Sequence, residues 1–126
     1  MVEDLLRSHE MRVFSNHVYE FKKGVRNMVL YTVPKKFEEL TTKRLKNQNI
    51  DFAIQHVSCN KINLYFGKKE CINAIKLIAS RPLNKITPEE DFILGMMLGY
   101  DVCAQCERYC RKKSNFTSDV QEGFSG

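Results

Sequence analysis

The sequence predicts an α+β fold: a three-stranded antiparallel-type sheet with a βαββα core, packed by helices that include a long C-terminal one. Two observations predict this class. Two segments near the middle of the chain alternate apolar and polar residues with the period of strands, and a short turn separates them. Four other segments repeat apolar residues every three or four positions, as amphipathic helices do.

The first half of the domain reads as helix, strand and helix. Residues 15–24 carry apolar side chains at helical spacing, with Ser15 as the expected N-cap and Gly24 at the end. Residues 27–33 are mostly apolar and partly β-branched, which indicates a strand covered on both faces. The segment 35–49 has lysines on one side and apolar residues on the other, which predicts an amphipathic helix.

The middle of the domain reads as a hairpin followed by a helix. Segments 50–57 and 62–66 alternate, and the loop between them has hairpin length. Residues 68–80 then show the apolar period of a helix lying on the sheet. A capping box follows, because Thr87 stands three residues before Glu90 and a proline occupies the first helical position.

This order resembles a split βαβ unit that has lost its last strand. Without a fourth strand, the first strand or its neighbour is left as an open edge, and open edges invite pairing with another chain. We therefore expect a homodimer. At 126 residues the chain has the length of one domain. We expect this domain at 13–113, after a partly disordered extension at 1–12 and before a disordered tail at 114–126.

From Glu89 to Lys112 small and apolar residues recur every three or four positions, which predicts one unbroken helix of about six turns. Free cysteine packs as a small hydrophobe, and a helical Gly-x-x-x-Gly pair indicates a close neighbour. We expect this seam to form a helix-packing or dimer contact. Its key residues are Gly95, Gly99, Cys103, Cys106 and Cys110.

The same three cysteines leave a metal or redox role open as an alternative. On an unbroken helix Cys103 and Cys110 lie roughly 10 Å apart along the axis, whereas thiolates on one zinc lie within about 4 Å. One metal ion therefore does not bind all three, and His9, His17 and His56 are scattered. We expect no metal and no cofactor. Thiol redox chemistry or an iron–sulfur centre remains the alternative.

Positive charge is concentrated in one stretch of a chain whose net charge is +5. Residues 22–46 hold eight bases against two acids, Glu38 and Glu39. A patch of this kind attracts an acidic protein or nucleic acid. We expect it to bind a partner. Its residues are Lys22, Lys23, Arg26, Lys35, Lys36, Lys43, Arg44 and Lys46.

We expect a cytoplasmic protein that does not bind a membrane. The chain has no apolar run near the roughly 18 residues of a transmembrane helix, and its first ten residues contain acids where a signal peptide has an apolar core. Five cysteines, an odd number, fit reduced thiols better than a disulfide framework.

We do not expect an enzyme, because no nucleophile elbow, P-loop, glycine-rich dinucleotide turn or zinc-protease helix occurs. The leading function is a non-enzymatic binding or regulatory module. The alternative is a nucleic-acid-binding module, in which sheet aromatics exposed beside the lysines stack on bases. The candidates are Tyr31, Phe52, Tyr65 and Phe66.

Three long strings carry a family resemblance: "NHVYEFKKGVRNMVLYT", "NLYFGKKECI" and "ITPEEDFILGMMLGYDVCAQCERY". With them the chain resembles, from about Val13 to Tyr109, a small bacterial family defined as a domain of unknown function. The resemblance implies three strands, about five helices and a homodimer. It also implies an association with flavodoxin genes, and hence an acidic electron carrier as partner. Of the three thiols, it marks only Cys106 as characteristic.

Overall fold

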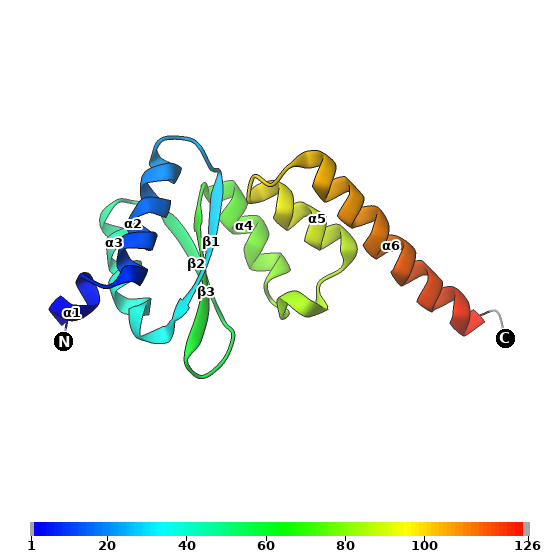
Figure 1. The fold of residues 1–126 in the computed structure, drawn as a ribbon, viewed down its shortest axis with the longest axis horizontal. Helices are drawn as coiled ribbons and strands as arrows, with labels where there is room; N and C mark the ends of the chain where they lie inside the picture. The colour runs from blue at the N-terminus through cyan, green and yellow to red at the C-terminus, as the bar shows by residue number, and fades with distance from the viewer. Residues whose placement is uncertain (1, 125–126) are drawn as a thin grey trace.

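The computed structural model describes the backbone of residues 2–124 and the side chains of residues 4–115. Figure 1 shows the sheet between two groups of helices, α2 and α3 on one side and α4, α5 and α6 on the other. The elements are α1 (Val2–Leu6), α2 (His9–Lys22), β1 (Met28–Pro34), the 3-10 helix η1 (Lys35–Phe37), α3 (Glu38–Asn47), β2 (Asp51–His56), β3 (Lys61–Gly67), α4 (Lys69–Ile78), the 3-10 helix η2 (Leu83–Lys85), α5 (Pro88–Met97) and α6 (Val102–Phe124).

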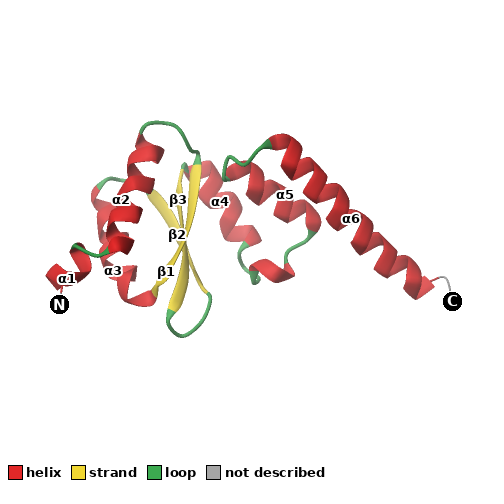
Figure 2. Cartoon of the chain, in the orientation of Figure 1, coloured by secondary structure: helices red, strands yellow, loops and turns green. Residues whose placement is uncertain are grey.

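The sheet has the order β1-β3-β2, and both outer strands run antiparallel to β3. Leu64 of β3 stands between Tyr31 of β1 and Ile54 of β2. Since β1 and β2 are both antiparallel to β3, they are parallel to each other, which is the split βαβ arrangement. The predicted α+β class, its βαββα core and the hairpin of the two middle strands are confirmed (Figure 2).

Helices cover both faces of the sheet, so β3 is buried from Ile62 to Gly67. Alternate side chains of a strand point to opposite faces, and the two faces therefore have separate cores. The core under α2 and α3 contains Met11, Phe14, Val18, Val29, Val33, Phe37, Leu45, Ile50, Ile62, Leu64 and Phe66. The core under α4 and α5 contains Met28, Tyr65, Ile72, Ile75, Ile78, Leu94 and Leu98.

The first core helix begins earlier than the sequence predicts. Ser8 caps α2, because its hydroxyl accepts the backbone N–H of Met11 at 3.3 Å, so Ser15 as N-cap is wrong. Met11 extends the apolar stripe by one turn and is 1% exposed. The expected domain boundary at residue 13 therefore falls inside α2. The end of the helix agrees with the prediction, since it closes at Lys22, two residues before Gly24.

The predicted unbroken helix from Glu89 to Lys112 is wrong. The Thr87 capping box starts α5 as predicted, but α5 ends at Met97 and α6 begins at Val102. Gly99 has φ +79°, a conformation that side chains disfavour, and it ends the helix as glycines commonly do. The two helices form an antiparallel hairpin, in which the core residues Leu94 and Leu98 fix α5 on the sheet.

The last helix extends beyond the expected end of the domain. The backbone of α6 is helical through Phe124. Residues 114–124 of the expected tail are therefore part of this helix, and residues 125 and 126 lie outside the described residues.

We predict that Gly67→Ala destabilises the fold by about 2–3 kcal/mol, the range of an overpacked core site. A Cβ at Gly67 would lie 2.3 Å from the Asn27 carbonyl oxygen and 2.7 Å from the Met28 Cα, so backbone has to move. Gly99→Ala is the matched control. Its Cβ meets nothing within 4 Å, and only the left-handed backbone costs about 1 kcal/mol. Urea unfolding measures both, and equal losses would contradict the close approach at Gly67.

Candidate functional site

A groove of about 280 Å³ runs between α2 and α3 on the side facing away from the sheet. Two contacts hold the helices together across it. The Lys22 Nζ donates to the Gln48 Oε1 at 2.7 Å, and the Arg44 Nη1 donates to the Ser15 Oγ at 3.1 Å. The groove thus has cations on its rim and apolar side chains on its floor. It is lined by Phe14, Ser15, Val18, Tyr19, Lys22, Arg44 and Gln48.

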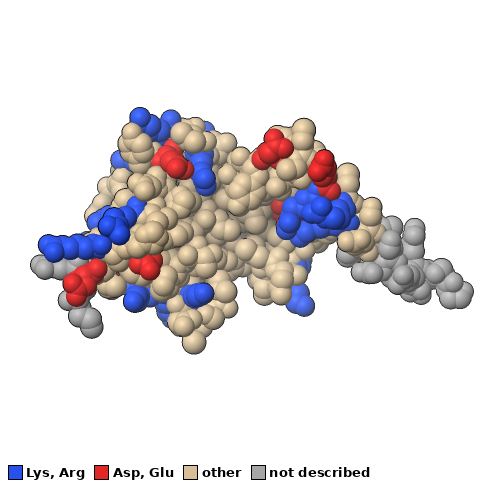
Figure 3. Space-filling view, in the orientation of Figure 1, with Lys and Arg blue, Asp and Glu red and all other residues tan. Residues whose placement is uncertain are grey.

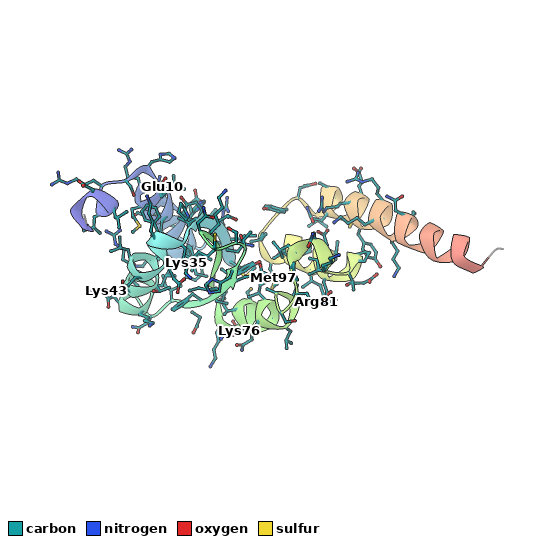
Figure 4. The ribbon with its side chains drawn as sticks, turned by 90° about the horizontal axis from the view of Figure 1, so that it is seen from below. Glu10, Lys35, Lys43, Lys76, Arg81 and Met97 are labelled. Atoms are coloured by element: carbon teal, nitrogen blue, oxygen red, sulfur yellow. The ribbon has the colours of Figure 1, made fainter. Side chains whose placement is uncertain are left out.

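The eight predicted basic residues lie on this helical layer and at its two ends. Lys22 and Lys23 end α2 beside the C-terminal turn of α3, whereas Lys35 and Lys36 precede α3 at its other end. Figure 3 shows Lys and Arg spread over this part of the molecule, and in Figure 4 Lys43 of α3 lies apart from Lys76 of α4. The structure therefore spreads the predicted patch over the whole layer.

Most of this positive charge has no internal acid to balance it. Among the side chains from 4 to 115, only Arg26 of the eight forms an ion pair, with Glu20 at 3.2 Å. The ammonium groups of Lys23, Lys36 and Lys46 lie instead over the rings of Tyr19, Phe37 and Phe52, 4.9–6.0 Å from the ring centroids. Such cation–π contacts leave the charge available to a partner.

Acids in the first turn of α5 join the two helices of the hairpin. Asp91 accepts two hydrogen bonds from Arg108, at 2.8 and 3.1 Å, and one from Lys112 at 3.3 Å. The hydrogen bond from Arg108 is the main reason that the pKa of Asp91 lies below its usual value. The sequence does not reveal this role, because the partners on α6 lie 17 and 21 residues away and would be out of reach on one straight helix.

The helix break changes the environment of the three predicted cysteines. Cys103 and Cys106 now stand in the first two turns of α6, and both are exposed, as is Cys110. Their predicted packing against the rest of the chain is wrong, because α6 turns Gln105, Arg108 and Tyr109 toward α5 instead. A dimer contact through these cysteines stays a prediction.

The predicted glycine pair separates into two roles. A Cβ on Gly95 would fall 2.0 Å from the Gln105 Oε1, so α6 does approach α5 closely at this residue. Gly99 has nothing within 4 Å and serves as the helix terminator. At Gly95 the close neighbour is thus α6 of the same chain, and a helix or dimer contact through the whole predicted seam stays a prediction.

The sheet carries a chain of polar side chains that sequence reasoning missed. The Thr32 hydroxyl donates to the Asn63 Oδ1 at 2.6 Å, and the Asn63 Nδ2 donates to the Gln55 Oε1 at 3.0 Å. Gln55 in turn donates to the Arg81 carbonyl at 2.9 Å and so fixes the chain after α4. The Tyr65 hydroxyl also donates to Gln55, and burial raises the pKa of Tyr65 to about 12. The sequence signal for this chain was one polar residue in each strand, at positions that the sheet register places side by side.

The sheet aromatics are covered by helices. Tyr65 and Phe66 are fully buried, and the Tyr31 hydroxyl donates to the Glu10 carbonyl of α2 at 3.2 Å. Phe52 is half-buried and packs against the core under α2 and α3. The predicted stacking platform for bases is therefore wrong for Tyr65 and Phe66, because helices occupy both faces of the sheet.

A histidine between α2 and the sheet has an unusual environment. His17 lies against the ring of Tyr31, with 5.3 Å between ring centroids, and its Nδ1 is buried without a hydrogen-bond partner among the described residues. Burial is the main cause that lowers the pKa of His17, and the positive charge of Arg26 adds to it. The neutral ring is thus the form that the fold favours.

The described residues contain neither a cluster of metal ligands nor a membrane-spanning helix. Within the described side chains, no three His, Cys, Asp or Glu residues are grouped so that they would hold a metal ion. In the described part of the chain no helix has both the length and the apolar character needed to cross a bilayer.

Fold and site together define a small α+β protein: a split βαβ sheet with helices on both faces and a C-terminal helical hairpin. The family described as "Protein of unknown function (DUF2023)" matches residues 12–112, and the chain belongs to this family. The matched region contains the groove, the polar chain of the sheet, α5 and the first half of α6. Among curated proteins no match was found.

We predict that the stability of the fold decreases as the pH falls from about 7.5 through 6.5. The unfolded chain takes up a proton at His17 with a pKa of 6.5, above the pKa in the fold, so acid favours the unfolded state. His17→Gln should flatten this part of the urea-unfolding profile. His9→Gln, at the exposed start of α2, is the control and should keep it. An unchanged slope in His17→Gln would show that another group titrates.

Proposed function

We propose that the protein is a non-enzymatic binding module whose α2–α3 layer engages an acidic protein partner. The observation that carries this proposal is the groove between α2 and α3, with Phe14 and Val18 below a rim formed by Lys22 and Arg44. Neither rim cation forms an ion pair with the described residues. An acidic segment laid on this groove would gain both apolar contact and charge pairing.

A flavodoxin is the acidic protein that we propose as this partner, on the strength of the resemblance described above. With seven of the eight predicted bases outside any ion pair of the described side chains, long-range attraction accelerates encounter with an acidic surface. Exposed charges are screened within about 10 Å at 0.1 M salt. The proposed complex is therefore strong at low ionic strength and weak at high ionic strength.

We also propose that the module acts as a homodimer and that the helical hairpin makes the contact. Ile93, Tyr100 and Val102 of the hairpin region are 45%, 53% and 52% exposed, and a second copy packed there would remove these apolar side chains from water. The hairpin lies on the side of the sheet opposite to α2 and α3 (Figure 1). A dimer of this kind leaves the basic layers of both copies accessible.

Nucleic-acid binding is not the function that we propose. The predicted mode of nucleic-acid binding required bases to stack on exposed aromatic side chains of the sheet. Tyr65 and Phe66 are not exposed, because helices cover them completely. Phosphate binding through lysines alone would remain sequence-independent. The covered sheet thus favours a protein partner over a nucleic acid.

A second candidate function is thiol–disulfide exchange in a reducing cytoplasm. The observation that favours it is the position of Cys103 and Cys106, a Cys-x-x-Cys pair in the first two turns of α6, with both thiols exposed. On a helix their Cα atoms lie about 5 Å apart, and those of Cys106 and Cys110 about 6 Å. Both distances fit a disulfide, whereas Cys103 and Cys110 are too far apart.

The exchange is a two-electron reaction with a small disulfide such as oxidised glutathione. The Cys106 thiolate attacks one sulfur, which forms a mixed disulfide and releases one glutathione thiolate. The Cys103 or Cys110 thiolate then attacks the Cys106 sulfur, forms the internal disulfide and releases the second glutathione thiolate. The protein loses two electrons and two protons in total, and Cys106 takes part in either pairing.

We predict that the double charge reversal Lys22→Glu/Arg44→Glu weakens binding to a flavodoxin about tenfold or more at low salt. Fluorescence anisotropy with labelled flavodoxin at about 20 mM and 300 mM salt measures the affinity and its salt dependence. Lys69→Glu/Lys76→Glu on α4 is the matched control, since both lysines are exposed and the change in net charge is the same. It should weaken binding about twofold at most.

Two results would refute this proposal. Absence of binding at the lower salt concentration removes flavodoxin as the partner. Equal losses in the two double variants would mean that net charge alone acts and that the groove is not the binding site.

We predict that oxidised glutathione converts the protein to a form with one internal disulfide that includes Cys106. Intact mass and peptide mapping under non-reducing conditions identify the pair. Cys106→Ser should abolish it, whereas Cys59→Ser, which removes an exposed thiol of the β2–β3 loop, should not. Independent glutathionylation of the three thiols would exclude the switch. Disulfides between chains would instead favour the dimer contact.

A further inference from the structure

A second cavity lies between the sheet and the helical hairpin, on the side opposite to the α2–α3 groove. Its volume is about 500 Å³, within the range of small-molecule sites. We call it the hairpin cleft. It is bounded by β1, by the η2 segment and by the facing sides of α5 and α6.

One wall of the hairpin cleft is apolar. Leu94 of α5 and Leu98, the residue that follows α5, belong to the core under α4 and α5, and they also line the cavity. Leu30 from the sheet and Leu83 and Ile86 from the η2 segment complete this wall, and all three are half-buried. A hydrocarbon or aromatic group of a ligand would be removed from water here, with a gain of about 25 cal/mol for each Å² buried.

The opposite wall contains the side-chain amide of Gln105. Gln105 is 9% exposed and lines the cavity, and its side chain makes no hydrogen bond with the described residues. The amide lies on the bare backbone of Gly95, where a Cβ would come within 2.0 Å of its oxygen. Neither amide atom is fully buried, so both remain accessible to solvent, and the Nε2 can donate a hydrogen bond to a ligand in the cavity.

Charge at the same wall favours an anion. Arg108 and Lys112 both line the cavity, against the single carboxylate of Asp91. Arg108 donates hydrogen bonds to Asp91 from its Nε and one Nη. Its other terminal nitrogen can donate a hydrogen bond to a ligand. Since the pKa of Asp91 is lowered by these hydrogen bonds, the three groups together carry one positive charge at neutral pH.

We infer that the hairpin cleft binds a small carboxylate with an apolar body. The carboxylate accepts hydrogen bonds from Arg108 and the Gln105 amide, and the apolar body lies against Leu94 and Leu98. Tyr100 is 53% exposed and stands at the mouth of the cavity. This site does not depend on the α2–α3 groove, so it extends the proposed function.

Octanoate is the probe for this inference, and the full chain is titrated with it while amide chemical shifts are followed by NMR. The expected result is saturable shifts of the residues that line the hairpin cleft, with a Kd below about 1 mM. Octylammonium has the same apolar body with the opposite charge and should bind at least tenfold more weakly. Equal binding of the two, or no shift at these residues up to about 10 mM octanoate, would overturn the inference.

Three variants test which groups make the site. Arg108→Gln, which leaves Lys112 beside Asp91, and Gln105→Leu should each weaken octanoate binding about tenfold, the loss of one good hydrogen bond. Gly95→Ala should weaken it also, because the added Cβ displaces the Gln105 amide. Arg111→Gln on the exposed side of α6 is the matched control and should bind as the unchanged protein does.

Unfolding in urea shows whether each variant keeps its fold. If Gln105→Leu fails to fold, Gly95→Ala still tests the role of the amide, since alanine is the better helix former by about 1 kcal/mol. Retained binding in both Gln105→Leu and Gly95→Ala would overturn the role of the amide. A loss of the same size in Arg111→Gln would overturn the assignment of the charge to Arg108.

Discussion

The central strand β3 is the constraint on which the rest of the structure depends. It pairs with both other strands and is buried on both faces, with Tyr65 in one core and Phe66 in the other. Complete burial of one large apolar side chain contributes about 1.5–3 kcal/mol, whereas an exposed ion pair such as Arg26–Glu20 contributes about 0–1 kcal/mol. The cores on β3 therefore decide where the two helical layers lie.

The break at Gly99 is the second constraint, and it determines the chemistry of the C-terminal part. Because α6 folds back on α5, Asp91 meets Arg108 and Lys112, Gln105 lies on Gly95, and a cavity opens toward the sheet. The same reversal leaves Cys103 and Cys106 exposed at the start of α6. The turn at Gly99, with its positive φ, thus replaces the predicted packed seam by an α6 helix whose cysteines face the solvent.

The two candidate surfaces lie on opposite sides of the sheet, and this separation has a physical consequence. A protein bound to the α2–α3 layer and a small molecule or disulfide at the hairpin would not compete for space. The polar chain from Thr32 through Asn63 to Gln55 crosses the sheet and is tied to the backbone at Arg81. It is the continuous hydrogen-bonded path between the sheet and the segment that leads into the hairpin.

The sequence by itself determined what depends on neighbours along the chain: the βαββα order, the β2–β3 hairpin and the capping box of Thr87 and Glu90. Each follows from spacing within about ten residues. Only the tertiary structure decided that α5 ends before Gly99, because an intact helix and a helical hairpin satisfy the same apolar period. The position of the Gln105 amide on Gly95, the cleft and the exposure of the cysteines follow from that one choice, since contacts between α5 and α6 leave no local pattern.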